Sequence, residues 1–265
     1  MAYSTYKKIR KQYPTIVIKI GGRPTTDLDC MLSLADDIIE LQKTGIRVAV
    51  VHGGGARVTT LSERLGVTAR FTDGVRITGH QDMLIADQVL SGEMNTELVR
   101  LFHNRGTQAV GLTGCDAGLC TAQPLAEHTG QVSSLQPRVL RVLWKAGMLP
   151  IIASVSQDTH GTPMNINADE FARGIAAGLS AAALVYISDI PGILIRGSVV
   201  THLTPPEIEK AILEDEIRDG MIAKTRAATA GLQQGIGTVC IGDYAVAGNL
   251  VSLLTGKRGT HIGTF

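Results

Sequence analysis

The sequence predicts an α/β fold: a three-layer sandwich with a central, largely parallel sheet, arranged as two lobes. Short β-branched runs of strand length alternate with longer segments whose apolar residues recur at helical spacing. Glycines follow the first two of these runs, where a parallel strand would turn toward the next helix. The order strand, helix, strand along the chain favours parallel pairing, with helices covering the sheet.

The first strand–helix–strand unit shows these patterns most clearly. Residues 15–20 form a β-branched, apolar run, which predicts a buried strand that stops at a glycine pair. Residues 28–39 carry apolar side chains every three or four positions, which predicts an amphipathic helix ending near Gly45. Residues 47–52 predict the second strand, and the three glycines at 53–55 open the next helix.

The same patterns continue to the carboxyl terminus. Pro137 and Pro206 suit the first turn of a helix, because that position needs no N–H donor. Further strands are predicted at residues 108–112, 149–153, 183–188 and 238–241. Further helices are predicted at residues 81–90, 95–105, 137–146, 168–179, 206–213, 222–234 and 245–254.

The chain is expected to form a single domain over residues 1–265. No low-complexity or Pro/Ser-rich linker divides it, and the weakest candidate seam is the polar stretch at residues 156–164. We therefore expect two lobes that share a continuous sheet, over residues 1–164 and 165–265, rather than two independent domains.

Composition excludes several classes of partner. Lys and Arg number 25 against 24 Asp and Glu, a net charge of +1, so neither nucleic acid nor an anionic membrane is expected. The basic run at residues 7–11 is interpreted as a solvated, frayed terminus. No apolar stretch approaches the ~20 residues that span a bilayer, which predicts a soluble, cytoplasmic protein. The four cysteines lack zinc spacing and are expected to be reduced thiols.

Common nucleotide-binding and hydrolase signatures are missing. The sequence contains no P-loop, no G-x-G-x-x-G after a strand, no G-x-S-x-G and no H-E-x-x-H. Instead, glycine turns follow the predicted parallel strands, at the edge where ligands of open α/β sheets bind. The triple glycine at residues 53–55 leads directly into a helix whose free N–H groups could hold an anion.

Lys19 is the most informative single residue. A charge within the apolar run at residues 16–20 would be costly to bury without an anionic partner. Although a lysine can extend from an edge strand into solvent, the adjacent Gly21 and Gly22 favour a phosphate partner. Lys224 taken alone is typical of a solvated helix, and Asp169 of a helix N-cap.

Six segments, in order and spanning nearly the whole chain, together resemble the acetylglutamate kinase subfamily of the amino-acid kinase family. The segments are VIKIGG at 17–22, VHGGG at 51–55, DGVRIT at 73–78, NINAD at 165–169, SDIPGIL at 188–194 and DGMIAK at 219–224. The resemblance implies phosphorylation of the side-chain carboxylate of N-acetyl-L-glutamate by ATP, in arginine biosynthesis. It also implies that residues 1–164 bind the acylated amino acid and residues 165–265 bind ATP.

The resemblance implies catalytic roles for three residues. Lys19 and Lys224 would neutralise the charge that develops on the transferred phosphoryl group, and Asp169 would hold both lysines. A carboxylate nucleophile is ionised at pH 7, so no general base is required. Gly54, Gly55, Arg76, Asn165 and Asn167 would bind the acylated amino acid, with Arg76 clamping its α-carboxylate.

The nucleotide site implied by the resemblance draws on both glycine turns and loops. Its residues are Gly21, Gly22, Ser188, Asp189, Gly192, Ile193, Leu194, Glu216, Ile217 and Arg218. The phosphates of ATP, rather than protein side chains, would carry Mg²⁺. The segment before Lys19 is short, and arginine-inhibited hexameric relatives carry a longer helix there, so a homodimer without arginine feedback is expected.

Two departures and three alternatives remain. Arg23 and Pro24 stand where the family often has small or apolar residues, and Cys115 where many relatives carry lysine. A kinase for N-succinylglutamate or an aminoadipate derivative fits the same motifs. Sibling kinases for carbamate, aspartate or UMP are disfavoured by the segments at 73–78 and 165–169. A non-catalytic sensor on this scaffold would predict loss of Lys19, Asp169 or Lys224, and all three are present.

Overall fold

A computed structural model describes residues 2–72, 75–218 and 220–264. The chain forms two compact units, one comprising Met1–Val48 and Leu179–Phe265 and the other Ala49–Gly178. These units do not coincide with the lobes expected at residues 1–164 and 165–265. Which substrate each part of the chain binds stays a prediction.

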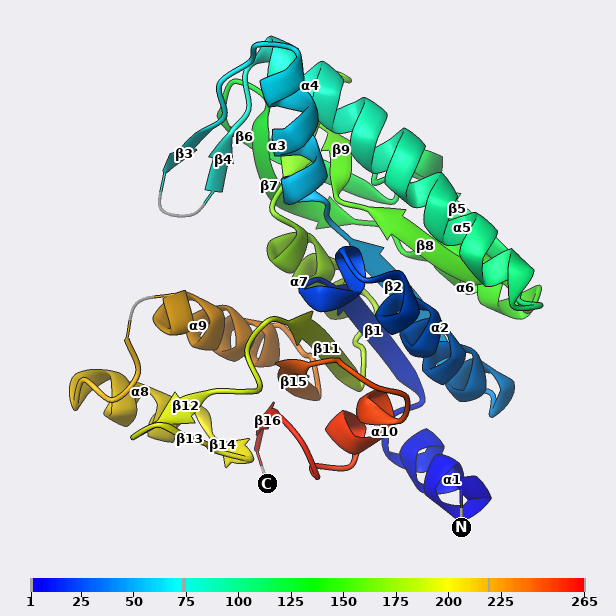
Figure 1. The fold of residues 1–265 in the computed structure, drawn as a ribbon, viewed down its shortest axis with the longest axis vertical. Helices are drawn as coiled ribbons and strands as arrows, with labels where there is room; N and C mark the ends of the chain where they lie inside the picture. The colour runs from blue at the N-terminus through cyan, green and yellow to red at the C-terminus, as the bar shows by residue number, and fades with distance from the viewer. Residues whose placement is uncertain (1, 73–74, 219, 265) are drawn as a thin grey trace. The chain divides into compact units, whose positions relative to one another are not determined.

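The first unit contains parallel strands flanked by helices (Figure 1). Its sheet has the order β14-β16-β15-β11-β1, with β1, β11 and β15 parallel and β16 antiparallel to β15. Helices α9 and α10 contact β15, and α10 also contacts α2. The helices are α1 Ala2–Gln12, η1 Arg23–Thr25, α2 Leu28–Lys43, α8 Pro205–Leu213, α9 Gly220–Gln233 and α10 Asn249–Leu254. The strands are β1 Thr15–Ile20, β11 Ala183–Ser188, β12 Leu194–Ile195, β13 Ser198–Val199, β14 His202–Leu203, β15 Thr238–Asp243 and β16 Thr260–Ile262.

The second unit combines three parallel strands with a small closed barrel. Strands β2, β8 and β5 pair in parallel, and β10, β7, β6 and β9 close the barrel. The helices are α3 Gly55–Arg64, α4 His80–Ala86, η2 Asp87–Met94, α5 Asn95–Asn104, η3 Asp116–Gly118, α6 Arg138–Lys145 and α7 Ala168–Gly178. The strands are β2 Arg47–His52, β3 Arg70–Thr72, β4 Val75–Ile77, β5 Ala109–Leu112, β6 Cys120–Ala126, β7 Thr129–Leu135, β8 Leu149–Ala153, β9 Val155–Gln157 and β10 Pro163–Ile166.

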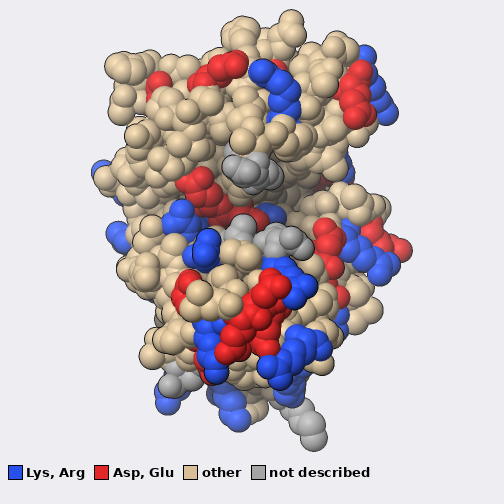
Figure 2. All heavy atoms as spheres, turned by 90° about the vertical axis from the view of Figure 1, so that its left-hand side faces the viewer, with Lys and Arg blue, Asp and Glu red and all other residues tan. Residues whose placement is uncertain are grey.

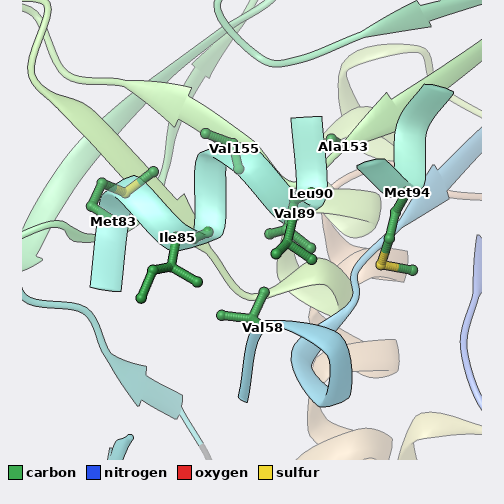
Figure 3. Packing of buried hydrophobic residues seen from close by; sticks show 9 residues of the cluster. Val58, Met83, Ile85, Val89, Leu90, Met94, Ala153 and Val155 are labelled. Carbon is green, nitrogen blue, oxygen red and sulfur yellow. The ribbon is translucent and has the colours of Figure 1, made fainter. Parts of the chain in front are cut away.

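An apolar cluster fixes the long helical segment of the second unit. Val58 of α3 packs against Val89 and Leu90 of η2, with Met83 of α4 and Met94 in the same cluster (Figure 3). Helices α4, η2 and α5 follow one another without a break in helical backbone, and η2 is a stretch of π-helix. Such widened turns occur frequently at functional sites.

The predicted largely parallel sheet with flanking helices is confirmed, but three local predictions are wrong. The first residues form α1 instead of a frayed terminus, because Ile9 and Tyr13 bury their side chains. The expected polar loop at 156–164 is shorter than predicted, because residues 156–157 and 163–164 belong to the antiparallel strands β9 and β10. The last helix begins at Asn249, not at 245, because Gly248 takes a left-handed φ of 84° before it.

Candidate active site

Two glycines allow the end of β1 to lie against the end of β11. Gly22 has a φ of 65°, and a Cβ there would lie 2.6 Å from the carbonyl carbon of Ser188. A Cβ on Gly21 would lie 2.9 Å from the carbonyl oxygen of Ile187 and 2.6 Å from Lys19 Nζ. The Lys19 ammonium therefore lies over the glycine turn, at the carboxyl end of a parallel strand.

The second predicted lysine reaches the same strand end. Lys224 lies in the second turn of α9, and its Nζ donates a hydrogen bond to Ser188 Oγ at 3.2 Å. Asp189 follows directly, with its Oδ1 2.8 Å from the position of a Cβ on Gly22. The structure thus brings Lys19, Lys224, the glycine pair and Ser188 together within one unit.

The other predicted nucleotide-binding residues divide into buried and exposed groups. Ile193 and Ile217 are fully buried, and the Ile193 N–H donates to Thr260 Oγ1 at 2.8 Å. Position 192 favours glycine for steric reasons, because a Cβ there would lie 2.7 Å from Val199 Cγ1. Leu194 lies in β12 and pairs with Val199 of β13.

The half-buried Glu216 and the exposed Arg218 form ion pairs next to Ile217. Glu216 Oε1 lies 2.5 Å from the guanidinium of Arg196, which links the α8–α9 connection to the β12–β13 hairpin. Arg218 pairs with Asp215 Oδ2 at 2.6 Å. The first contact joins the two segments predicted to line the nucleotide site, and the second lies within one of them.

In the second unit, the triple glycine leads into α3 as expected. A Cβ on Gly54 would lie 2.1 Å from Met94 Sδ and 2.7 Å from Leu90 Cδ2, so any other residue there requires these two side chains to move. A Cβ on Gly55 would meet nothing within 4 Å. Gly54 precedes the first turn of a ten-residue helix, whose N–H groups can receive an anion.

Arg76 is buried next to this turn. Its Nη2 contacts the hydroxyl of Thr59 and the carbonyl oxygen of Gly55, the latter at 3.5 Å. Its Nη1 lies 3.7 Å from Asp82 Oδ1, and the ring centroid of Phe71 lies 4.9 Å from Arg76 Cζ. Burial lowers the pKa of Arg76, while Asp82 opposes that shift. The guanidinium remains charged and is held in place.

The segment at residues 165–169 supplies hydrogen bonds around β10 and α7. Asn165 Nδ2 donates to the buried Thr78 Oγ1 at 3.0 Å. Asn167 Oδ1 accepts from the backbone N–H of Asp169 at 2.9 Å. Asn167 therefore caps α7 and Asp169 lies in its first turn, so Asp169 does not serve as the N-cap.

His52, which stands beside the triple glycine, has a supporting role. It is buried, its Nδ1 lies 3.0 Å from the carbonyl oxygen of Gly53, and its Nε2 lies 3.0 Å from Asn95 Nδ2. Desolvation lowers its pKa to about 4, so the ring is neutral at pH 7. Asn95 also donates to the carbonyl oxygen of Ile151, which joins the glycine turn to β8.

Cys115 lacks the features of a nucleophile. Burial raises the pKa of its thiol, opposite to the shift that activation requires. Its loop is instead fastened by Asp116, whose Oδ2 accepts from the N–H and the hydroxyl of Thr113 at 2.6 and 2.8 Å.

Sequence reasoning missed two polar neighbours of Arg76. Asp82 and Thr59 contact its guanidinium but lie outside the six matching segments. A buried carboxylate in the first turn of α4 gives no distinct signal in one sequence, because acidic residues favour helix starts in any case. Residues 73, 74 and 219 of those segments lie outside the described residues.

The described surface and side chains agree with the near-zero net charge. On the face drawn in Figure 2, Lys and Arg lie among Asp and Glu. In the described parts of the chain, no helix combines the length and apolarity needed to cross a membrane. Within the same ranges, no three His, Cys, Asp or Glu side chains gather as a metal site would require.

Comparison with known proteins identifies the family. Over 260 residues the chain is 37% identical to the acetylglutamate kinase of Nautilia profundicola, covering 96% of this chain and 93% of that one. It is also 37% identical to the chloroplastic acetylglutamate kinase of Arabidopsis thaliana, covering 86% of this chain and 69% of that one. The crystal structure of smu.665 from Streptococcus mutans UA159 superposes with a TM-score of 0.81 at 28% identity, covering 94% and 98%. A model of the amino acid kinase family matches residues 14–243. The glycine turns, the two lysines near the ends of β1 and β11 and these likenesses agree: the chain belongs to the amino acid kinase family.

Proposed function

We propose that the protein transfers the γ-phosphoryl group of ATP to the side-chain carboxylate of N-acetyl-L-glutamate, a step of arginine biosynthesis. The observation that carries the proposal is the 37% identity to a bacterial acetylglutamate kinase over 93% of that protein's length. The six segments that resemble that subfamily include Lys19, Lys224, Asp169, Arg76 and the glycines of both turns.

In the proposed reaction, a carboxylate oxygen of the acceptor attacks the γ-phosphorus. The new O–P bond forms as the bond from the γ-phosphorus to the β,γ-bridging oxygen breaks, and ADP leaves with that electron pair. Both reactants are anions, so alignment and fixed positive charge dominate catalysis. No proton has to be removed from the ionised nucleophile.

We assign the charge stabilisation to Lys19 and Lys224. The support is that Lys19 Nζ lies over Gly21, while Lys224 Nζ hydrogen-bonds Ser188, which also borders Gly22. The family resemblance gives Asp169 the role of accepting hydrogen bonds from both lysines in the substrate-loaded enzyme. Backbone N–H groups of the glycine turns would complete the cradle for phosphate oxygens.

We assign acceptor recognition to the triple-glycine turn and to Arg76. A buried, bidentate guanidinium matches an α-carboxylate better than an ammonium does. Gly54 and Gly55 would present N–H groups at the start of α3. Asn165 would contact the acylated amino acid directly, and Asn167 would act by capping α7.

The nucleotide would lie along the end of β11 and the two segments joined by the Arg196–Glu216 ion pair. The proposed residues are Gly21, Gly22, Ser188, Asp189, Gly192, Ile193, Leu194, Glu216, Ile217 and Arg218. We propose that Mg²⁺ enters on the ATP phosphates, where it supplies positive charge to the transferred group. The acidic side chain nearest the glycine pair is Asp189, which could face that ion through water.

Two further parts of the proposal concern assembly and location. We propose a cytoplasmic homodimer, as the resemblance implies. Neither nucleic acid nor a membrane is proposed as a partner, in keeping with the balanced charge.

Two rival functions have to be distinguished: a kinase that phosphorylates a different acylated amino acid, and a sensor that catalyses no reaction. ADP release should be measured side by side with N-acetyl-L-glutamate, N-succinyl-L-glutamate and N-acetyl-L-aminoadipate. The proposal predicts the highest kcat/KM with N-acetyl-L-glutamate. Preference for another acceptor would favour a sibling kinase, and no turnover with any acceptor would favour a sensor.

A further inference from the structure

Arg76 and Asp82 form an incompletely satisfied buried pair. Their side chains are 7% and 8% exposed, and 3.7 Å separates Arg76 Nη1 from Asp82 Oδ1. Among the described residues, neither of these two atoms has a hydrogen-bond partner. Buried polar atoms are nearly always hydrogen-bonded, and leaving one unpaired is costly. The pair therefore presents one free donor and one free acceptor side by side.

Contacts on their other sides hold both residues near these positions. The other nitrogen of the guanidinium, Nη2, already contacts Thr59 and the Gly55 carbonyl. Asp82 lies in the first turn of α4, where the next residue, Met83, is buried in the apolar cluster of Figure 3. The backbone that carries Asp82 is thus anchored by packing.

The Asp82 carboxylate lies beside Arg76, the residue predicted to bind the α-carboxylate of the acceptor, and this position requires an explanation. Asp82 cancels the charge of Arg76 at short range, and alone this would weaken the attraction for an anionic acceptor. The cost is offset if the acceptor also brings a hydrogen-bond donor to Asp82. An acylated amino acid has both groups, because its α-carboxylate and amide N–H sit on the same α-carbon. Standard bond lengths place those oxygen and nitrogen atoms about 3 Å apart, so one acylated amino acid can reach both free atoms, which lie 3.7 Å from each other.

We propose that Asp82 is a further specificity-determining residue, which accepts a hydrogen bond from the amide N–H of the acylated amino acid whose α-carboxylate binds Arg76. The inference rests on the proposed function and adds a residue to it. It identifies the substrate class as one with a donor N–H on the α-carbon. A site built to bond an N–H rejects an analogue that lacks it, because its own acceptor then stays buried and unpaired.

The test compares two acceptors that differ in one atom. N-acetyl-L-glutamate carries the amide N–H, and (S)-2-acetoxyglutarate carries an ester oxygen in its place. The ratio of kcat/KM for the amide to that for the ester should be measured for wild type, D82A, D82N and D87A. Asp87, five residues further on, hydrogen-bonds Ser91 and serves as the matched control.

Wild type should favour the amide by about 10- to 100-fold, the range for a hydrogen bond to a charged group. D82A should bring the ratio close to one, D82N should give an intermediate ratio, and D87A should keep the wild-type ratio. KM for ATP should not change in any variant. If D82A does not fold, the D82N ratio decides the matter.

Two results would overturn the inference while leaving the proposed function intact. One is a wild-type ratio near one. The other is an equal change in kcat/KM for the amide and the ester acceptor in D82A and D82N. That result would make Asp82 only a counterion of Arg76. Failure of the wild type to phosphorylate N-acetyl-L-glutamate at all would instead contradict the proposed function, and this inference with it.

Discussion

The two units build their candidate ligand contacts in different ways. In the first unit, Lys19 and Lys224 are half-buried long side chains beside a glycine turn, whose shape is set by close backbone contact between β1 and β11. In the second unit, Arg76 is almost fully buried and is held by Thr59, Asp82 and Phe71. The first arrangement suits a group whose charge changes during reaction. The second suits a group that must be recognised and held still.

The largest expected effect falls on the lysines. Lys19→Ala and Lys224→Ala should each lower kcat by at least about 10²-fold, because each removes a cation that stabilises the transferred phosphoryl group. Steady-state kinetics with saturating ATP and acceptor would measure the loss. Lys210→Ala on the exposed face of α8 is the matched control and should leave kcat unchanged. Near-normal kcat in either lysine variant would remove that residue from the mechanism.

The next effect concerns pH and the glycine turn of the second unit. His52 titrates at about 4 when folded and near 6.5 when unfolded. Between those values the unfolded chain takes up a proton that the folded chain does not, so stability is lost as the pH falls from 6.5 toward 4. The loss should approach about 3 kcal/mol, since each pKa unit is worth about 1.4 kcal/mol.

Urea unfolding at pH 7.0 and pH 4.5 would measure this dependence, with His52→Gln as the comparison. The variant should lose less stability than wild type over the same interval. If wild type and His52→Gln lost the same unfolding free energy between pH 7.0 and pH 4.5, His52 would not be buried in its neutral form.

A smaller effect separates two adjacent glycines. Gly54→Ala should destabilise the protein by about 1–3 kcal/mol, because the added methyl group meets Met94 and Leu90. Gly55→Ala should stay within about 0.5 kcal/mol of wild type, since a Cβ there meets nothing within 4 Å. Thermal unfolding of the two variants gives the comparison. Equal destabilisation would contradict the packing of η2 against the turn.

The smallest effect sharpens the recognition role of Arg76. Arg76→Lys keeps the charge but loses the planar pair of donors, so KM for N-acetyl-L-glutamate should rise about tenfold. KM for ATP should be unchanged. Arg64→Lys, at the exposed end of α3, is the control. An equal rise in both KM values would indicate general damage instead of lost acceptor binding.

Much of the parallel sheet could be predicted because its strands are short apolar runs. β1, β2, β8 and β11 are buried along nearly their whole length, and such strands stand out from the helices between them. The barrel was missed because its strands are polar and irregular. β6 and β7 read as loop in the sequence, and Glu127 makes their turn at a φ of 43° without glycine.

The candidate site was predicted by motif and resemblance more than by residue chemistry. Lys19 could be singled out from its apolar surroundings alone, whereas Lys224 looks like any solvated helix lysine. Its hydrogen bond to Ser188, 36 positions away, depends on how α9 packs in the first unit. Asp82 illustrates the same limit, because burial beside Arg76 cannot be read from a helix-start aspartate.

The central claim is that a side-chain carboxylate becomes an acyl phosphate. The purified protein should be incubated with ATP, Mg²⁺ and N-acetyl-L-glutamate, followed by ³¹P NMR and by trapping with hydroxylamine. We predict a new acyl-phosphate resonance that disappears on trapping, with one γ-hydroxamate formed for each ADP released. ADP release without hydroxamate, or a phosphorylated product that hydroxylamine does not consume, would contradict the account.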